Sequence, residues 1–213
     1  MEIAGLIDHT FLRPTCRQED AAQLCAEAID LGFKAVCVPP LFVQFCAQKL
    51  SSFDPKIATV IGYPYGYSMT AAKVVEIGRA LDDGADELDA VINISAVKNN
   101  NWNYVRNDIE SITRATHLRG KVVKIILETA LLSEDEMKKV CEICIESGVN
   151  FIKTSTGIIE GATVENVSFL RNFLPNEIKI KASGGIKTAE QVEALVNAGA
   201  DRIGTSTGIN IIR

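Results

Sequence analysis

Eight short runs rich in β-branched residues recur along the chain, and each is followed by a helical or loop segment. Parallel strands need a crossover between them, usually a helix, so this alternation predicts a parallel sheet. The predicted strands are residues 6–11, 34–38, 57–62, 87–93, 121–128, 150–154, 179–183 and 202–205. Eight such units favour a TIM (β/α)8 barrel that takes up residues 1–213 as a single domain.

Glycines mark the ends of the helical segments. Gly often adopts the left-handed conformation that ends a helix. The predicted helices include residues 18–31, 70–83, 133–147 and 188–198, which are followed by Gly32, Gly84, Gly148 and Gly199. Only STGINIIR remains after the last strand, so the final helix is the weakest element. A doubly wound open sheet is the alternative, but no G-x-G-x-x-G follows the first predicted strand.

Composition and charge exclude several kinds of partner. With 47% hydrophobic residues the chain can bury one sizeable core. Its net charge is −5 and it has no basic stripe, which argues against nucleic-acid binding. No apolar run approaches the length of a membrane span, and the N-terminus lacks the features of a secretory signal. We therefore expect a cytoplasmic protein without a membrane partner.

The cysteines and histidines do not indicate a metal site. Cys141 and Cys144 form a C-x-x-C, but both fall on an apolar helical stripe with Met137, so we predict that they pack in the core. His9 and His117 are the two histidines, which leaves few nitrogen ligands for a metal. We expect reduced thiols, no metal and no cofactor.

Charged residues lie inside several predicted strands, where a buried parallel strand should be apolar. Alternation of side chains along the strand at 121–128 also puts Glu128 on the face of Lys124. Unpaired buried charge costs several kcal/mol, so a purely structural network of ion pairs is one interpretation. Five such residues together favour a catalytic barrel interior instead. They are Asp8, Asp89, Lys124, Lys153 and Lys181.

The segments that follow the last two predicted strands are rich in Gly, Ser and Thr: SGGIK at 183–187 and GTSTG at 204–208. TIM barrels frequently bind a phosphate with these two loops, where backbone N–H groups can approach an anion. The pattern predicts a phosphorylated substrate. Two ordinary helix N-caps are the alternative.

Lys153 and Lys181 lie on consecutive predicted strands, so their amines could be neighbours. A lysine attacks a carbonyl only when it is neutral, and burial and a nearby cation both favour the neutral form. Asp89, two strands away, could transfer protons. The pattern predicts aldol chemistry through an enamine on a sugar phosphate. The residues alone leave open which lysine is the nucleophile.

Over nearly its whole length the sequence resembles the deoxyribose-phosphate aldolases. The matching motifs are IDHTFLRP (7–14), AVCVPP (35–40), VIGYPYG (60–66), ADELDAVINI (85–94), VKIILET (123–129), FIKTSTG (151–157), IKASGGIKT (180–188) and RIGTSTG (202–208). The resemblance implies a class I aldolase on a TIM barrel, a lyase of deoxyribose catabolism. It would reversibly cleave 2-deoxy-D-ribose 5-phosphate to acetaldehyde and D-glyceraldehyde 3-phosphate without a cofactor, as a homodimer or homotetramer.

The resemblance also implies roles for individual residues. Lys153 is the Schiff-base residue, Lys181 tunes its pKa, and Asp89 transfers protons with Lys181 and a water. Phosphate contacts are expected at Gly157, Gly184, Gly185, Gly204, Thr205 and Ser206, where Gly204 would let the backbone approach the phosphate. Asp8, Cys37 and Lys124 match positions that line the family's pocket.

Two features depart from the family pattern. Some members have a phosphate-binding lysine directly after KTSTG, where this chain has Ile158, and Lys187 is the candidate replacement. Some members end in a tail whose tyrosine assists proton transfer, whereas this chain ends at Arg213. Enamine protonation would then rest on Asp89, Lys181 and water. The alternatives are a Schiff-base aldolase or transaldolase with another donor, and a non-catalytic barrel that binds sugar phosphates.

Overall fold

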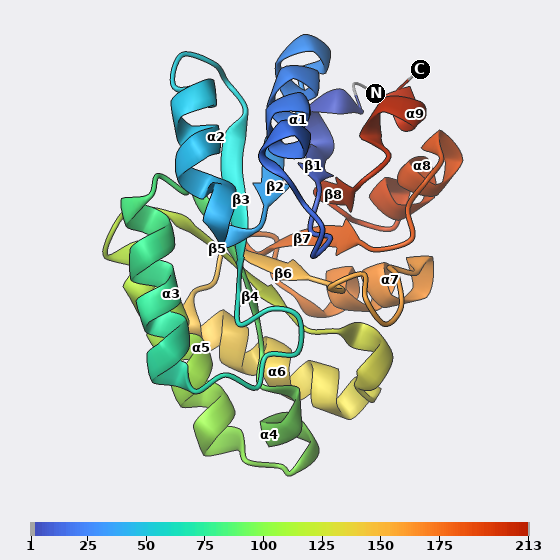
Figure 1. Ribbon diagram of the computed structural model, residues 1–213. Helices are drawn as coiled ribbons and strands as arrows, with labels where there is room; N and C mark the ends of the chain where they lie inside the picture. The colour runs from blue at the N-terminus through green and yellow to red at the C-terminus, as the bar shows by residue number, and fades with distance from the viewer. Residues whose placement is uncertain (1–2, 213) are drawn as a thin grey trace.

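The computed structural model describes residues 3–212, which form a closed barrel of eight parallel strands (Figure 1). The strands follow chain order around the barrel, and β1 pairs with both β2 and β8. This confirms the predicted TIM barrel and excludes the open sheet. The strands are β1 (Ile7–Thr10), β2 (Ala35–Val38), β3 (Lys56–Ile61), β4 (Glu87–Val91), β5 (Val122–Ile126), β6 (Phe151–Lys153), β7 (Lys179–Ser183) and β8 (Arg202–Thr205).

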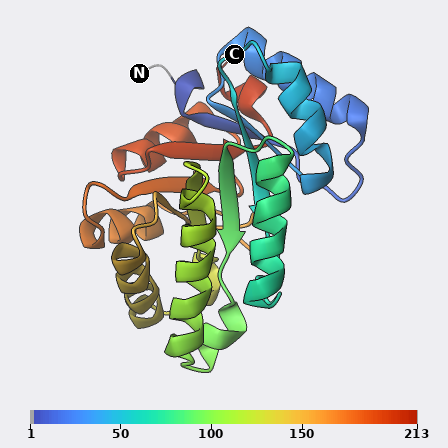
Figure 2. The ribbon, with the colours of Figure 1, turned by 90° about the vertical axis from the view of Figure 1, so that its left-hand side faces the viewer.

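Helices cover the outside of the barrel. Figure 2 shows α3, α5 and α6 standing in a row on one side. The α-helices are α1 (Gln18–Leu31), α2 (Val43–Leu50), α3 (Thr70–Asp82), α4 (Ile94–Lys98), α5 (Trp102–His117), α6 (Glu134–Ser147), α7 (Val164–Phe173), α8 (Ala189–Asn197) and α9 (Gly208–Ile212). Three short 3-10 helices span Ala4–Leu6, Pro40–Phe42 and Thr129–Leu131. None of the helices within residues 3–212 is both long and apolar enough to cross a membrane.

The predicted glycine stops are confirmed at two helices. Gly32 ends α1 and Gly148 ends α6, both as left-handed C-caps. At α3 and α8 the cap is instead Asp83 and Ala198, and the left-handed glycine comes one residue later. The chain therefore leaves these two helices through one additional residue before it turns back to the barrel.

The main hydrophobic core lies between the strands and the surrounding helices. Cys141 and Cys144 on α6 are fully buried in it as free thiols, which confirms that the C-x-x-C packs in the core. Burial raises the pKa of Cys141 to about 12, so its thiol stays protonated at neutral pH. Within residues 3–212 no group of His, Cys, Asp or Glu side chains could hold a metal ion.

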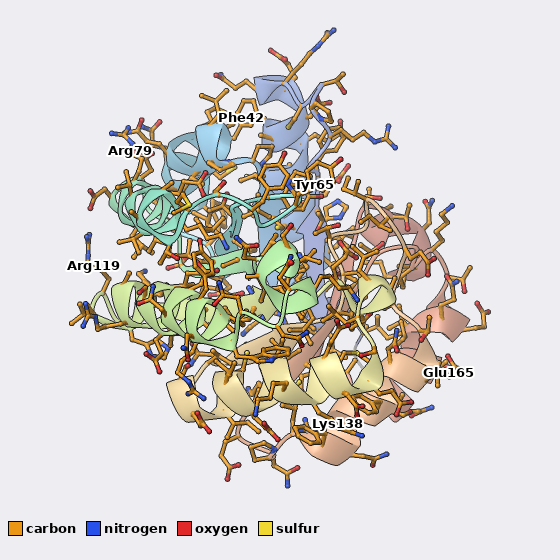
Figure 3. All side chains as sticks on the ribbon, turned by 90° about the horizontal axis from the view of Figure 1, so that it is seen from below. Phe42, Tyr65, Arg79, Arg119, Lys138 and Glu165 are labelled. Atoms are coloured by element: carbon orange, nitrogen blue, oxygen red, sulfur yellow. The ribbon has the colours of Figure 1, made fainter. Side chains whose placement is uncertain are left out.

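The outer surface of the helices is polar and charged. Figure 3 shows Arg79, Arg119 and Lys138 at the periphery of the molecule, away from the barrel. These side chains pair only with exposed or half-buried acidic neighbours, such as Arg119 with Asp82 at 2.9 Å. Exposed pairs of this kind contribute little to stability, so the chemically informative charges lie inside the barrel.

Candidate active site

One half of the barrel interior holds a dense network of ion pairs. Its cations are Lys124, Lys153, Lys181 and Arg202, and its carboxylates are Asp8, Glu87 and Asp89. They come from β1 and β4 to β8, which the closed sheet brings around one axis. The other half, at β2 and β3, is an apolar cluster of Cys37, Ala58 and Val60. Charge is therefore concentrated on one side of the interior.

Asp89 lies at the centre of the network. Its Oδ2 accepts hydrogen bonds from Lys153 Nζ at 2.9 Å and from Lys181 Nζ at 2.7 Å, and its Oδ1 accepts one from Lys124 Nζ at 2.7 Å. Burial by itself would raise the pKa of Asp89, but the charges of the three lysines outweigh it and hold the pKa well below its usual range. Asp89 is therefore ionised at neutral pH.

Lys181 and Lys124 are each held by more than one carboxylate. Lys181 Nζ lies 2.5 Å from Asp8 Oδ2 as well as 2.7 Å from Asp89, and Lys124 Nζ lies 2.6 Å from Glu87 Oε2. Burial would lower the pKa of each amine, but the neighbouring carboxylates outweigh it and raise both values above normal. Both lysines are therefore firmly cationic.

Lys153 differs from the other two lysines in its contacts. Among residues 3–212 its Nζ contacts a single carboxylate oxygen, Asp89 Oδ2, which Lys181 also contacts. The register pairs Lys153 with Lys181 on the adjacent strands β6 and β7, as the sequence predicted (Figure 1). Each of the three carboxylates also contacts Lys124, Lys181 or Arg202, so Lys153 makes the fewest carboxylate contacts of the three lysines among residues 3–212.

A cavity of about 410 Å³ opens at the carboxyl ends of the strands. Lys153 lines this cavity, whereas Asp8, Cys37, Asp89, Lys124 and Lys181 lie outside its lining. The lining also includes all six residues predicted to bind phosphate: Gly157, Gly184, Gly185, Gly204, Thr205 and Ser206. The structure thus brings the predicted nucleophile and the predicted phosphate loops together around one space.

The glycines of the two loops pack backbone against backbone. Gly157 and Gly184 both have positive φ, at 83° and 89°. A Cβ on Gly184 would lie 2.9 Å from Gly161 Cα and 3.0 Å from Gly157 Cα, which is too close for any other residue. The loop after β6 and the loop after β7 can therefore meet only because these positions carry no side chain.

Gly204 has a structural reason to be small that the sequence did not indicate. A Cβ there would lie 2.9 Å from Ser183 Cβ and 3.1 Å from Lys181 Cε. The position is glycine because the side chain of Lys181 passes beside it on the way to Asp8 and Asp89. Residues 204–209, GTSTGI, nearly repeat the hexapeptide KTSTGI at residues 153–158, and the position that is Gly204 in one copy is Lys153 in the other.

Of the three residues that match the family's pocket positions, Asp8 and Lys124 belong to the ion network beneath the cavity. Cys37 is fully buried in the apolar half of the interior, where burial is the main cause that raises the pKa of its thiol. These residues support the site from below instead of facing the cavity.

Several residues of the site were not predicted. Glu87 and Arg202 are charged residues at the first positions of the predicted strands 87–93 and 202–205. A search for charged residues in buried strands, which singled out Lys153, would also have found them. Arg13 and Tyr63 line the cavity from the loops after β1 and β3. Burial raises the pKa of Tyr63 to about 12, so its phenol keeps its proton at neutral pH. Nothing in the sequence distinguished this tyrosine from its neighbours.

Glu128 does not lie where strand alternation put it. The strand β5 ends at Ile126, and Glu128 adopts a left-handed backbone with φ 57° and ψ 64°. The alternation of faces therefore stops before Glu128. Its fully buried carboxylate turns to the next loop, where Oε2 accepts hydrogen bonds from the backbone N–H of Thr156 at 3.1 Å and from its hydroxyl.

Comparison with known proteins places the chain in a family. Residues 3–213 match the sequence pattern of the DeoC/LacD family aldolases. The deoxyribose-phosphate aldolase of Thermococcus gammatolerans is 49% identical over 215 residues, which cover 100% of this chain and 96% of the relative. That of Desulfitobacterium hafniense strain Y51 is 46% identical over 213 residues, which cover 100% of this chain and 98% of the relative.

Solved structures agree with the sequence comparison. A putative deoxyribose-phosphate aldolase from Coccidioides immitis superposes with a TM-score of 0.95 at 38% identity, covering 99% of this chain and 84% of that one. The deoxyribose phosphate aldolase of Aeropyrum pernix, described as a tetramer, gives 0.93 at 32% identity, with 99% and 89% covered. The chain therefore belongs to the DeoC/LacD family of aldolases.

Proposed function

We propose that this protein is a deoxyribose-phosphate aldolase, a class I lyase that reversibly cleaves 2-deoxy-D-ribose 5-phosphate to acetaldehyde and D-glyceraldehyde 3-phosphate. One observation carries the assignment of the nucleophile. Of the three lysines in the interior network, Lys153 is the one that lines the cavity within residues 3–212. The named relatives support the choice of substrate, because they are deoxyribose-phosphate aldolases that match over the full chain.

The reaction begins when the neutral amine of Lys153 attacks the C1 aldehyde of the open-chain sugar. A proton delivered through water protonates the hydroxyl of the resulting carbinolamine, and loss of water then gives an iminium ion. A base then removes the proton of the C3 hydroxyl, the C2–C3 bond breaks, and glyceraldehyde 3-phosphate leaves. The electron pair of the broken C2–C3 bond stays with the two-carbon fragment, which remains attached to Lys153 as the enamine of acetaldehyde. Protonation at C2 and hydrolysis by water release acetaldehyde and restore the amine.

Asp89 and Lys181 have roles that follow from their contacts. Asp89 Oδ2 is the acceptor that touches Lys153 Nζ, so it is placed to pass the proton that Lys153 must lose before attack on to water, while Asp89 itself stays ionised. Lys181 shares that oxygen and remains cationic, which opposes a second positive charge at Lys153. Water completes the proton transfers between this pair and the cavity.

The substrate's phosphate would bind at the glycine-rich end of the cavity. Gly157, Gly184, Gly185, Gly204, Thr205 and Ser206 line that end, where their backbone N–H groups would contact the phosphate. The hydroxyl of Thr205 already donates to the carbonyl of Ile186 at 2.7 Å, so Ser206 would supply the hydroxyl. Lys187 and Arg13 line the same cavity and supply cations, although Ile158 occupies the position where some family members have lysine. An arginine suits a phosphate because its guanidinium can donate two parallel hydrogen bonds.

We also propose a cytoplasmic homo-oligomer, either a dimer or a tetramer. The A. pernix relative, described as tetrameric, supports the larger assembly. The substrates are small molecules, and neither nucleic acid nor a membrane is needed for the reaction.

Reductive trapping tests the function and the nucleophile together. Acetaldehyde and borohydride should leave an ethyl group on Lys153, which peptide mass spectrometry would locate, and Lys153→Arg should abolish both the adduct and turnover. Cleavage of deoxyribose 5-phosphate is followed in parallel by a coupled assay for glyceraldehyde 3-phosphate. An adduct on Lys181 or Lys124 instead, or no adduct, would exclude the assignment. Efficient use of dihydroxyacetone in place of acetaldehyde would indicate a different aldolase or a transaldolase.

A further inference from the structure

Glu128 is a buried acid that the reaction above does not use. It is fully buried, it is one of two non-glycine residues with positive φ among residues 3–212, and its Oε1 contacts no donor in that range. A left-handed non-glycine residue and an unpaired buried oxygen both cost free energy. The surroundings must therefore hold Glu128 in this position.

All the polar groups of Thr156 are bound. Its N–H and hydroxyl donate to Glu128 Oε2, its Oγ1 accepts from Ile158 N at 3.2 Å, and its carbonyl accepts from Tyr63 Oη at 3.2 Å. Thr156 is therefore hydrogen-bonded to Glu128 in the loop after β5 and to Tyr63 in the loop after β3. The backbone N–H of Thr129, the residue after Glu128, donates a hydrogen bond to the carbonyl of Thr154 at 3.0 Å.

The segment that Glu128 holds is the one that lines the cavity. Thr156, Gly157 and Ile158 all contribute to the lining, and they follow Lys153 by three to five residues. Lys153 itself is fixed separately, by its place in β6 and by Asp89. Loss of the Glu128 contact would therefore move the loop and leave the amine in place.

We propose that Glu128 is a positioning residue that sets the loop at 154–158 for the phosphate end of the substrate. It acts through Thr156 and does not itself touch the reacting atoms. The proposal rests on the proposed function for the identity of the substrate, but the geometry of the loop is independent of it. Glu128 would thus determine how well the phosphorylated sugar is held and would leave the formation of the Schiff base unaffected.

Three variants separate this role from others. Glu128→Ala should raise KM for deoxyribose 5-phosphate about tenfold, as expected for the loss of the hydrogen bonds that fix the loop, while acetaldehyde trapping at Lys153 keeps its rate. Thr156→Val should reproduce part of the rise in KM. Glu128→Gln should stay within about threefold of the parent protein, because one amide oxygen can accept both bonds now made to Oε2.

Asp201→Ala is the matched control. Asp201 Oδ2 accepts from the backbone N–H of Ile180 at 2.8 Å, near the opposite end of the barrel, so this variant should lose stability without a change in KM. An unchanged KM in Glu128→Ala, an equal loss of trapping, or a Glu128→Gln as impaired as the alanine variant would each overturn the proposal. If Glu128→Ala does not fold, Thr156→Val and Glu128→Gln decide the question alone.

Failure of the proposed function would look different. A parent protein that does not cleave deoxyribose 5-phosphate would overturn that function. The role of Glu128 in positioning the loop could then still be tested by phosphate binding. Calorimetric titration of the parent protein with inorganic phosphate tests the loop without turnover. About tenfold weaker binding by Glu128→Ala would support the role of Glu128, and equal binding would contradict it.

Discussion

At the scale of single residues, the contrast between Lys153 and Gly204 explains why two nearly identical hexapeptides differ at one position. Each position points toward the ion network, but one contributes the amine that faces the cavity and the other leaves room for Lys181. The two copies share a sequence but not a backbone, because Gly157 has positive φ in the loop after β6 whereas Gly208 begins α9. The first residue of each copy is set by what lies next to it.

Substitution of Gly204 tests this explanation. Gly204→Ala should destabilise the protein by about 1–3 kcal/mol, because the added methyl would overlap Ser183 and the stem of Lys181. The displaced Lys181 should also lower kcat. Urea unfolding and the coupled assay measure the two effects.

Gly78→Ala is the control, since a Cβ there meets nothing within 4 Å and the residue lies inside α3. We expect it to raise the free energy of unfolding by about 0.5–1 kcal/mol without changing kcat. Equal effects of the two substitutions would contradict the steric explanation.

Residue patterns located the site because charge inside a buried strand is rare. Lys153, Lys181 and Asp89 were found in this way, and their contacts agree with the prediction that they are neighbours. Which lysine faces the cavity could not be predicted, because β6 and β7 place both at the same level. That distinction comes from the tertiary structure, in which Lys181 contacts Asp8 and Asp89 beneath the cavity and Lys153 lines it.

At the scale of elements, α3 and α5 are joined by a buried ion pair that no periodicity indicated. Lys73 Nζ lies 2.7 Å from Asp108 Oδ2, both side chains are essentially inaccessible, and Lys73 also donates to the carbonyl of Val91 at the end of β4. Thr70 donates to the other oxygen of Asp108. The pair thus fixes two helices against the end of one barrel strand.

Removal of one partner should be costly. Asp108→Ala would leave Lys73 buried without its carboxylate, and we expect the free energy of unfolding to fall by about 3–5 kcal/mol. Arg106→Ala, on the same helix but in exposed pairs with Glu110 and Glu146, should change it by less than about 1 kcal/mol. Guanidinium unfolding of the two variants gives the comparison, and similar losses would contradict it.

Element boundaries were predicted well where apolar periodicity was strong and poorly where loops carried the function. The helix at 18–31 was predicted to the residue, and each strand to within two residues at either end. Glu128 was misplaced because alternation was extended past Ile126, where the backbone turns left-handed. The turn is explained by the contact of Glu128 with Thr156 in the loop after β6. A contact of this kind does not appear in the periodicity of the sequence.

At the scale of the whole molecule, the ion network links the stability of the barrel to pH. The pKa values of Asp8 and Asp89 are held below normal by neighbouring cations, despite burial. A carboxyl with a lowered pKa stabilises the fold above its unfolded value, about 3.9, and loses that contribution as pH falls further. Lys124 and Lys181, whose pKa values are raised, contribute below about 10.4 and lose their contribution above it.

We therefore expect the network's contribution to be constant between about pH 5 and 9 and to fall on both sides. Urea unfolding at a series of pH values should show a steep loss of stability below about pH 4. Asp8→Asn should be less stable at neutral pH but should show a shallower acid slope, because one titrating carboxyl is gone. An unchanged acid slope would mean that other groups control acid unfolding.

The contact between Asp8 and Arg202 joins the first strand to the last, across 194 positions of the chain. Proteins are synthesised from the N-terminus, so β1 leaves the ribosome long before β8. Until Arg202 and Lys181 have emerged, Asp8 lacks its two nearest cations, and the interior charges cannot be buried at acceptable cost. The ion network is therefore completed only when translation of the barrel is nearly finished, and a partly synthesised chain cannot hold it.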